Sequence, residues 1–187
     1  MNIFYLHKDP KTCAEMHCDK HVCKMIIEYA QLMCTAHRVI DGVPYEGRTA
    51  NNRKIARWLH PLENHEKLLY KASHINHPSN LWVRESQNHY NWLYEMWEHL
   101  CYEYTNRYGK VHMTDLKLRG ILASSPMQID VKPFVDPYLA MPDDVKQTNV
   151  VEAYKNYYIN YKKDFAKWTN RPVPEFMKFE THAGFAS

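Results

Sequence analysis

A group of polar residues between positions 17 and 24 has the types and the spacing to do chemistry. In an α-helix, His17, Lys20, His21 and Lys24 lie on one face, with Asp19 at its edge. A carboxylate among cations stays ionised and can stabilise a positive charge that develops on a substrate. Two interpretations remain open: a solvated, salt-bridged turn of a helix, or a functional site.

Pairs of histidines at helical spacing raise the question of a metal site. His17 and His21 have the i, i+4 spacing of two metal ligands on one helix. The chain lacks the glutamate that follows the first histidine in His-Glu-x-x-His, and it marks no third ligand. We therefore expect no bound metal and no cofactor. Two other pairs are incomplete in the same way: His60 with His65, and His74 with His77.

Basic residues gather at three further places, and the formal net charge is +3. If the fold brings them together, they form a surface for the phosphates of double-stranded DNA, the expected partner. Otherwise each is a separate solvated face. The clusters are Arg53, Lys54 and Arg57; Lys110, His112, Lys117 and Arg119; and Lys162, Lys163, Lys167 and Arg171. The candidate DNA contacts are His17, Lys20, His21, Lys24, Arg53, Lys54, Lys110, Lys117, Arg119 and Lys163.

The composition is that of one ordinary globular domain. The chain has 187 residues, of which 45% are hydrophobic and 24% charged. Its odd number of cysteines, five, and the lack of a CxxC pair or signal peptide predict reduced thiols in the cytoplasm, that of the host if a phage encodes the chain. No apolar run approaches the roughly 18 residues of a membrane span, so we expect none. We infer no obligate protein partner.

Several large enzyme classes are excluded because their motifs are missing. The sequence contains no Walker loop, no GxGxxG, no GxSxG and no Cys/His nucleophile signature.

Helix signals and apolar periodicity predict the elements that position these residues. Asp9 and Pro10 form a helix start, and the scarcity of glycine, five in all, disfavours strands and turns. Residues 2–6 predict a short strand or a buried extended start. The result is an all-α fold, a single compact helical domain over 1–187 with a long central helix and a short extended N-terminal segment. The expected helices are 10–39, 51–59, 62–73, 80–107, 114–123 and 149–168, with a long ordered loop at 124–146.

Taken in order, several segments resemble one enzyme family. The chain starts Met-Asn-Ile-Phe-Tyr-Leu-His, and a helix with a carboxylate near position 20 follows. Next come His77-Pro78, the stretch Glu103-Tyr104-Thr105-Asn106-Arg107-Tyr108-Gly109-Lys110, the turn Met141-Pro142-Asp143-Asp144 and a last helix rich in Tyr and Lys. Over most of its length the chain resembles the pyrimidine-dimer DNA glycosylases of the endonuclease V type, found in phages and bacteria.

The resemblance implies an all-α fold with the N-terminus lodged between helices. It also implies a bifunctional DNA glycosylase and abasic-site lyase, in which the N-terminal α-amine is the nucleophile and a carboxylate on the first helix assists. Carried over, the amine is that of Met1 and the carboxylate is Asp19, with Glu28 as a poorer candidate. An α-amine has a pKa of about 7.7–8.0, so a useful fraction is neutral and nucleophilic near pH 7.

Two alternatives remain open at this point. One is a different phage enzyme on a helical scaffold, which modifies DNA bases or nucleotides. The other is a non-catalytic phage protein that binds a nucleotide or a host factor. Covalent trapping on abasic DNA distinguishes the glycosylase and lyase from both.

Overall fold

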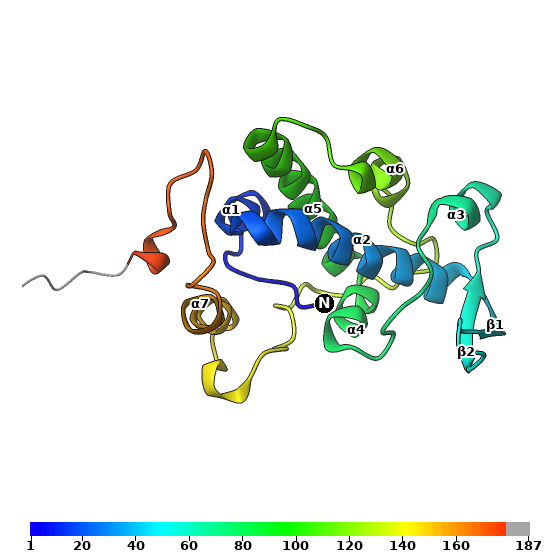
Figure 1. The fold of residues 1–187 in the computed structure, drawn as a ribbon. Coiled ribbons are helices and arrows are strands. Elements are labelled where there is room, and N and C mark those ends of the chain that lie inside the picture. The colour runs from blue at the N-terminus through cyan, green and yellow to red at the C-terminus, as the bar shows by residue number, and fades with distance from the viewer. Residues whose placement is uncertain (179–187) are drawn as a thin grey trace, which may run out of the picture.

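The computed structural model describes residues 1–178, which form a mostly helical fold (Figure 1). The mainly helical prediction is therefore confirmed, whereas the all-α prediction is corrected by one two-stranded sheet. The α-helices are α1 (Pro10–Met16), α2 (Asp19–Asp41), α3 (Glu63–Leu68), α4 (Pro78–Glu85), α5 (Gln87–Tyr108), α6 (Met113–Leu122) and α7 (Val150–Tyr161). The other elements are the antiparallel strands β1 (Val43–Arg48) and β2 (Lys54–Leu59) and the short 3-10 helices η1 (Asp143–Val145) and η2 (Glu175–Met177).

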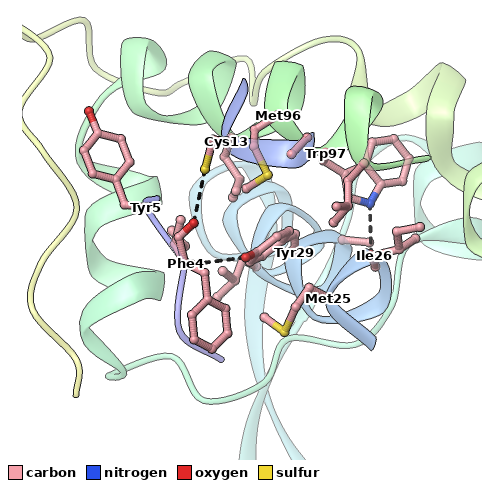
Figure 2. Close-up of a cluster of buried hydrophobic side chains, with 14 of the residues drawn as sticks. Phe4, Tyr5, Cys13, Met25, Ile26, Tyr29, Met96 and Trp97 are labelled. Atoms are coloured by element: carbon pink, nitrogen blue, oxygen red, sulfur yellow. Dashed lines mark hydrogen bonds between the residues drawn. The ribbon is translucent and has the colours of Figure 1, made fainter. Parts of the chain in front are cut away.

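The core lies largely between α2 and α5, with the N-terminal segment against it (Figure 2). The Trp97 indole on α5 donates a hydrogen bond to the Ile26 carbonyl on α2 at 2.9 Å. Such a bond satisfies the polar atom of an otherwise apolar side chain and fixes how the two helices pack. Helix α2 also contacts α4 and α6, so residues along its length reach several parts of the molecule.

The continuous helix expected over 10–39 is not found, because the chain breaks at His17 and Cys18 to give α1 and α2. His17 has an extended backbone, with ψ at 132°. The Arg107 guanidinium from α5 donates to the carbonyls of Glu15 and His17, at 3.0 and 2.7 Å. These bonds give the carbonyls at the end of α1 a partner outside the helix, so α1 can end there.

The helix expected over 51–59 was also a wrong prediction, since this region forms the hairpin of β1 and β2. Val43 pairs with Leu59 and Arg48 with Lys54. Asn52 in the turn adopts φ 58°, a left-handed conformation that asparagine tolerates. Gly47 lies under the Arg57 side chain: a Cβ added at position 47 would be 2.7 Å from the Arg57 Cγ, so a larger residue here has to displace that side chain.

The later helices follow the predictions more closely. The helix expected over 114–123 is α6, and the loop expected over 124–146 is irregular apart from η1. The helix expected over 80–107 is split into α4 and α5 at Ser86, whose hydroxyl accepts from the Asn88 N–H and caps α5. Gly109 ends α5 with φ 69°. Two expected helices are shorter than predicted: 62–73 reduces to α3, and 149–168 to α7.

The first residues of the chain are buried without forming a strand, as the extended start predicts. Ile3, Phe4, Tyr5 and Leu6 are each at most 5% exposed. The Phe4 N–H donates to the Tyr29 hydroxyl on α2 at 3.1 Å, and the Cys13 thiol on α1 donates to the Phe4 carbonyl at 3.2 Å (Figure 2). The segment is thus held between helices, and its position along α2 is fixed.

Candidate functional site

The α-amine of Met1 lies against a carboxylate on α2. Its nitrogen is 3.0 Å from the Glu28 Oε2, and the Lys24 ammonium is 3.4 Å from the other carboxylate oxygen of Glu28. Lys24 and Glu28 are one helical turn apart and share one face of α2. The amine is held there because Phe4, three residues on, is hydrogen-bonded to Tyr29, the residue after Glu28.

The Met1 and Glu28 pair is partly shielded from solvent. The side chain of Met1 is 9% exposed and that of Glu28 is 19% exposed, so Glu28 remains accessible. His77, which caps α4, lies within reach of the same charges: burial lowers its pKa, and the positive charge of the Met1 amine lowers the pKa further. Figure 1 shows the N-terminus beside α4. The amine is therefore surrounded by α2, α4 and its own buried segment.

Basic side chains border this pair on α2 and after α7. Lys20 and Lys24 are exposed on α2, and the Lys20 ammonium lies 4.6 Å from the centre of the Phe165 ring. Burial lowers the pKa of Lys162, and the nearby charge of Lys24 lowers it further. Lys24 and Lys162 thus place positive charge beside the Met1 and Glu28 pair, where it can attract an anion.

The other polar residues expected in this group are not at the surface. His17 and His21 are 0% and 5% exposed. His17 donates from Nδ1 to the Cys13 carbonyl at 2.8 Å and accepts at Nε2 from the Tyr29 hydroxyl at 2.7 Å. Burial lowers the pKa of His17 to about 4 and that of His21 to about 2, so both rings are neutral near pH 7. They support the N-terminal segment instead of offering a cationic contact to DNA.

Asp19 is held in a network that connects α2 to α5 and to the chain after α7. The Arg107 guanidinium lies 3.2 Å from its Oδ1, and Thr169 donates to it from the backbone N–H at 2.9 Å and from the hydroxyl at 2.7 Å. Asp19 and Glu28 are nine positions apart on α2. That spacing places them about 13 Å apart along the helix axis and half a turn apart around it. The structure therefore pairs the Met1 amine with Glu28, and Asp19 lies on the opposite face of α2.

The remaining basic residues do not form one surface. Arg53 and Lys54 are on the hairpin, which lies at the opposite end of the molecule from α7 and the lysines that follow it (Figure 1). Arg119 is bound to Asp115 and Glu98, so its charge is already compensated. Three expected contacts stay exposed on separate elements: Lys110, Lys117 and Lys163.

A second polar cluster was missed by the sequence reasoning. His37 and Asp41 on α2 meet His60, which follows β2, with their potential ligand atoms within 4.8 Å of one another. All three side chains are buried at the edge of a cavity of about 590 Å³. His37 and Asp41 have the same i, i+4 spacing as His17 and His21, so this signal was present. What the sequence did not mark was the third residue, since only the hairpin brings His60 back to α2.

Comparison with known proteins adds no relative. No family model matches the chain, and no curated protein and no solved structure is similar to it at a significant level. Separately, none of the helices within residues 1–178 is long and apolar enough to pass through a lipid bilayer. The functional proposal therefore rests on the residues of this chain and their geometry.

Proposed function

We propose that this protein is a DNA glycosylase and abasic-site lyase that acts on damaged or modified pyrimidines in double-stranded DNA. The nucleophile is the α-amine of Met1, and the assisting carboxylate is Glu28. The observation that carries the proposal is the 3.0 Å contact between the Met1 nitrogen and the Glu28 Oε2. A resemblance in the sequence suggested this chemistry, and the contact supplies a specific pair of groups for it.

Each group has a defined task in the reaction. Glu28 accepts a proton from the Met1 ammonium, and the neutral amine forms a bond to the sugar C1′ as the bond to the base breaks. The base leaves with the bonding electrons and takes up the proton that Glu28 carried, and the regenerated carboxylate stabilises the positive charge on the sugar. The nitrogen on C1′ passes a proton to O4′ as the C1′–O4′ bond breaks, which opens the sugar ring to a protonated Schiff base. Glu28 then takes a C2′ proton, and the C3′–O bond breaks with its electrons leaving on the phosphate oxygen. Water hydrolyses the remaining Schiff base and releases the Met1 amine.

Glu28 is better placed for this task than Asp19. Asp19 already accepts hydrogen bonds from Thr169 and pairs with the buried Arg107, so its oxygens serve the fold. Within residues 1–178, the ion pairs of Glu28 are with the Met1 amine and the exposed Lys24, and Glu28 has the longer side chain. Because Glu28 has few partners, it can release one of its ion pairs and contact the substrate instead.

The lysines beside the pair supply the expected contacts to phosphate. Lys24 pairs with the Glu28 carboxylate, the charge of Lys162 lies near that of Lys24, and Lys20 lies one turn before Lys24 on α2. Each is an ammonium that can bond to phosphate from several directions. We expect affinity for duplex DNA to fall steeply as salt rises, because each neutralised phosphate releases counterions. The lysines near Met1 should contribute more than Arg53 and Lys54 on the distant hairpin.

The test is a pair of glutamate variants. Glu28→Gln keeps the shape of the side chain but cannot accept the proton, so strand cleavage at an abasic site and base release from UV-irradiated duplex should each fall about 100- to 1000-fold. Glu63→Gln is the matched control, because Glu63 also pairs with a lysine one turn away, Lys67, but lies on α3. Wild-type rates in Glu28→Gln would contradict the proposal. Duplex binding with no turnover in the wild type would favour a non-catalytic binding protein.

A further inference from the structure

The cluster of His37, Asp41 and His60 has ring nitrogens without partners. His37 Nδ1 and His60 Nε2 are buried, and neither has a hydrogen-bond partner among residues 1–178. The His60 and Asp41 side chains are 0% and 1% exposed, and His37 is 2% exposed. A buried polar atom without a partner destabilises the fold, so two such atoms beside the same carboxylate indicate a binding site for a ligand between them.

The hydrogen bonds on the far side of the His37 ring define its tautomer. Its Nε2 is 2.9 Å from the Tyr90 hydroxyl, which itself donates to the Leu122 carbonyl at 2.9 Å. With the single proton of Tyr90 given to the Leu122 carbonyl, the matching His37 tautomer donates from Nε2 to the Tyr90 oxygen. In a neutral ring this leaves a free lone pair on Nδ1, directed into the cluster. Such an outer partner is typical of a histidine that binds metal.

Asp41 is held in place by two backbone N–H donors. Its Oδ2 accepts from the Met127 N–H at 2.7 Å, and its Oδ1 accepts from the Gln128 N–H at 3.0 Å. Each carboxylate oxygen has a further lone pair, and the Oδ2 lies 3.9 Å from His60 Nε2. That distance is too long for a hydrogen bond. The carboxylate and the ring therefore face each other across a gap that no described group fills.

His60 is positioned by two other contacts. Its ring stacks on that of His65 with centroids 4.7 Å apart, and its backbone N–H donates to the Glu66 carboxylate at 2.7 Å. The Leu62 N–H points at His60 Nδ1 at 3.2 Å. Coordination through Nε2 places the ring proton on Nδ1, so this long contact must open when a ligand binds.

We propose that His37 Nδ1, Asp41 and His60 Nε2 bind one divalent transition-metal ion of the zinc class. Two imidazoles and one carboxylate are the donor set of such ions, whereas Mg²⁺ and Ca²⁺ prefer oxygen ligands alone. A tetrahedral ion holds its ligand atoms about 3.4 Å apart, so the three donors, within 4.8 Å of one another, need small side-chain shifts.

The cavity beside the cluster leaves room for a fourth ligand. The cavity of about 590 Å³ is lined by His65, Lys117, Ser124 and Ser125 as well as by the three donors. Three protein ligands with an open position are the arrangement of catalytic zinc sites, in which the fourth ligand is water. The site is separate from Met1 and Glu28, so its occupancy does not depend on the function proposed above.

The test is metal binding by the full chain, purified without a histidine tag and freed of metal with EDTA. Isothermal titration with Zn²⁺ should show one site per chain, and Mg²⁺ should not compete for it. His37→Gln and Asp41→Asn each remove a ligand and should weaken Zn²⁺ binding at least about 100-fold. His99→Gln on α5 is the matched histidine control and should bind like the wild type, as should Glu28→Gln. Absence of Zn²⁺ binding, or equal affinity in all variants, would overturn the proposal.

A second measurement applies if the ligand variants do not fold, as judged by circular dichroism. Co²⁺ added to the wild type should broaden the NMR signals of the His37 and His60 rings. The buried rings of His17 and His21 should keep sharp signals, since both lie near the opposite end of α2. Broadening confined to other histidines, or none, would show that the cluster holds no metal.

Discussion

Two carboxylates on one helix, Asp19 and Glu28, differ in how much of their bonding capacity the fold uses. Asp19 is bound by Arg107 and by two donors of Thr169, at the junction of α1 and α2. Glu28 is bound by the Met1 amine and by the exposed Lys24. The comparison teaches that polar residue types at helical spacing do not identify a reactive group. The partners that the fold supplies decide whether a group is structural or free to act.

The largest expected effect is at the junction, from Arg107→Met. The Arg107 side chain is fully buried and binds Asp19, Glu103 and two carbonyls, so its removal takes a cation from the buried Glu103 and the donor from the Glu15 and His17 carbonyls. We expect the free energy of unfolding in urea to fall by about 3–5 kcal/mol. Arg119→Met is the control: Arg119 is 29% exposed, and its loss should cost about 1 kcal/mol or less. Equal losses of unfolding free energy in Arg107→Met and Arg119→Met would show that the junction of α1 and α2 is no more dependent on its arginine than α6 is.

A second prediction uses the neutral histidines under the N-terminal segment. The pKa of His17 is about 4 and that of His21 about 2 when folded, below the ordinary value of 6.5. The unfolded chain therefore binds more protons, and stability, complete above about pH 6.5, is lost as the pH falls toward these values. Each ring contributes about 1.4 kcal/mol per pH unit, or about 2.7 kcal/mol for both.

Urea unfolding at several pH values measures this slope. His21→Phe keeps an aromatic ring against Phe4 but cannot titrate, so its slope between pH 6.5 and 4 should be smaller by about 1.4 kcal/mol per unit. A wild-type stability that stays constant from pH 7 to 5 would mean that the rings are not buried neutral.

A third prediction separates stability from activity at Asp19. Asp19→Asn keeps the shape but weakens charge-assisted bonds to Arg107 and Thr169, which should cost about 1–2 kcal/mol in unfolding free energy. Cleavage of abasic DNA, assayed well below the melting temperature, should stay near the wild-type rate. A folded Asp19→Asn protein that is as inactive as Glu28→Gln would reverse the roles of the two carboxylates.

The smallest expected effect on stability is at Glu28. Its pair with the Met1 amine is partly exposed, so Glu28→Gln should lower the unfolding free energy by less than about 1 kcal/mol. This small cost alongside a large loss of activity is the signature of a functional group. A cost of several kcal/mol would instead identify the contact as an anchor of the N-terminal segment.

Local signals predicted much of the fold. The Asp9 and Pro10 start, the Gly109 end of α5 and helix α6 follow from capping residues and apolar periodicity, and all three are found. The break at His17 was not predictable in this way, because it depends on Arg107, ninety residues away in the sequence. The hairpin is not predicted, although Asn51 and Asn52 mark its turn, because the expected helix 51–59 runs across that turn.

The candidate site was less predictable than the fold. Met1 and Glu28 are brought together by packing of the segment from Ile3 to Leu6 along α2, and no local spacing encodes that contact. His37 and Asp41 do have helical spacing, but their third partner, His60, comes from beyond the hairpin. At both sites the sequence does not show which residues the tertiary fold brings together. It also does not show which of their polar atoms the fold leaves without partners.

Covalent trapping on DNA tests the central claim most directly. A duplex with a single abasic site is incubated with the protein and sodium borohydride, which reduces a Schiff base to a stable amine. Intact mass first establishes that Met1 carries a free amine, and peptide mapping then locates the adduct. We predict one adduct per chain on the α-amine of Met1, much reduced in Glu28→Gln and unchanged in Asp19→Asn. An adduct on a lysine side chain such as Lys24, or no adduct at all, would contradict the account.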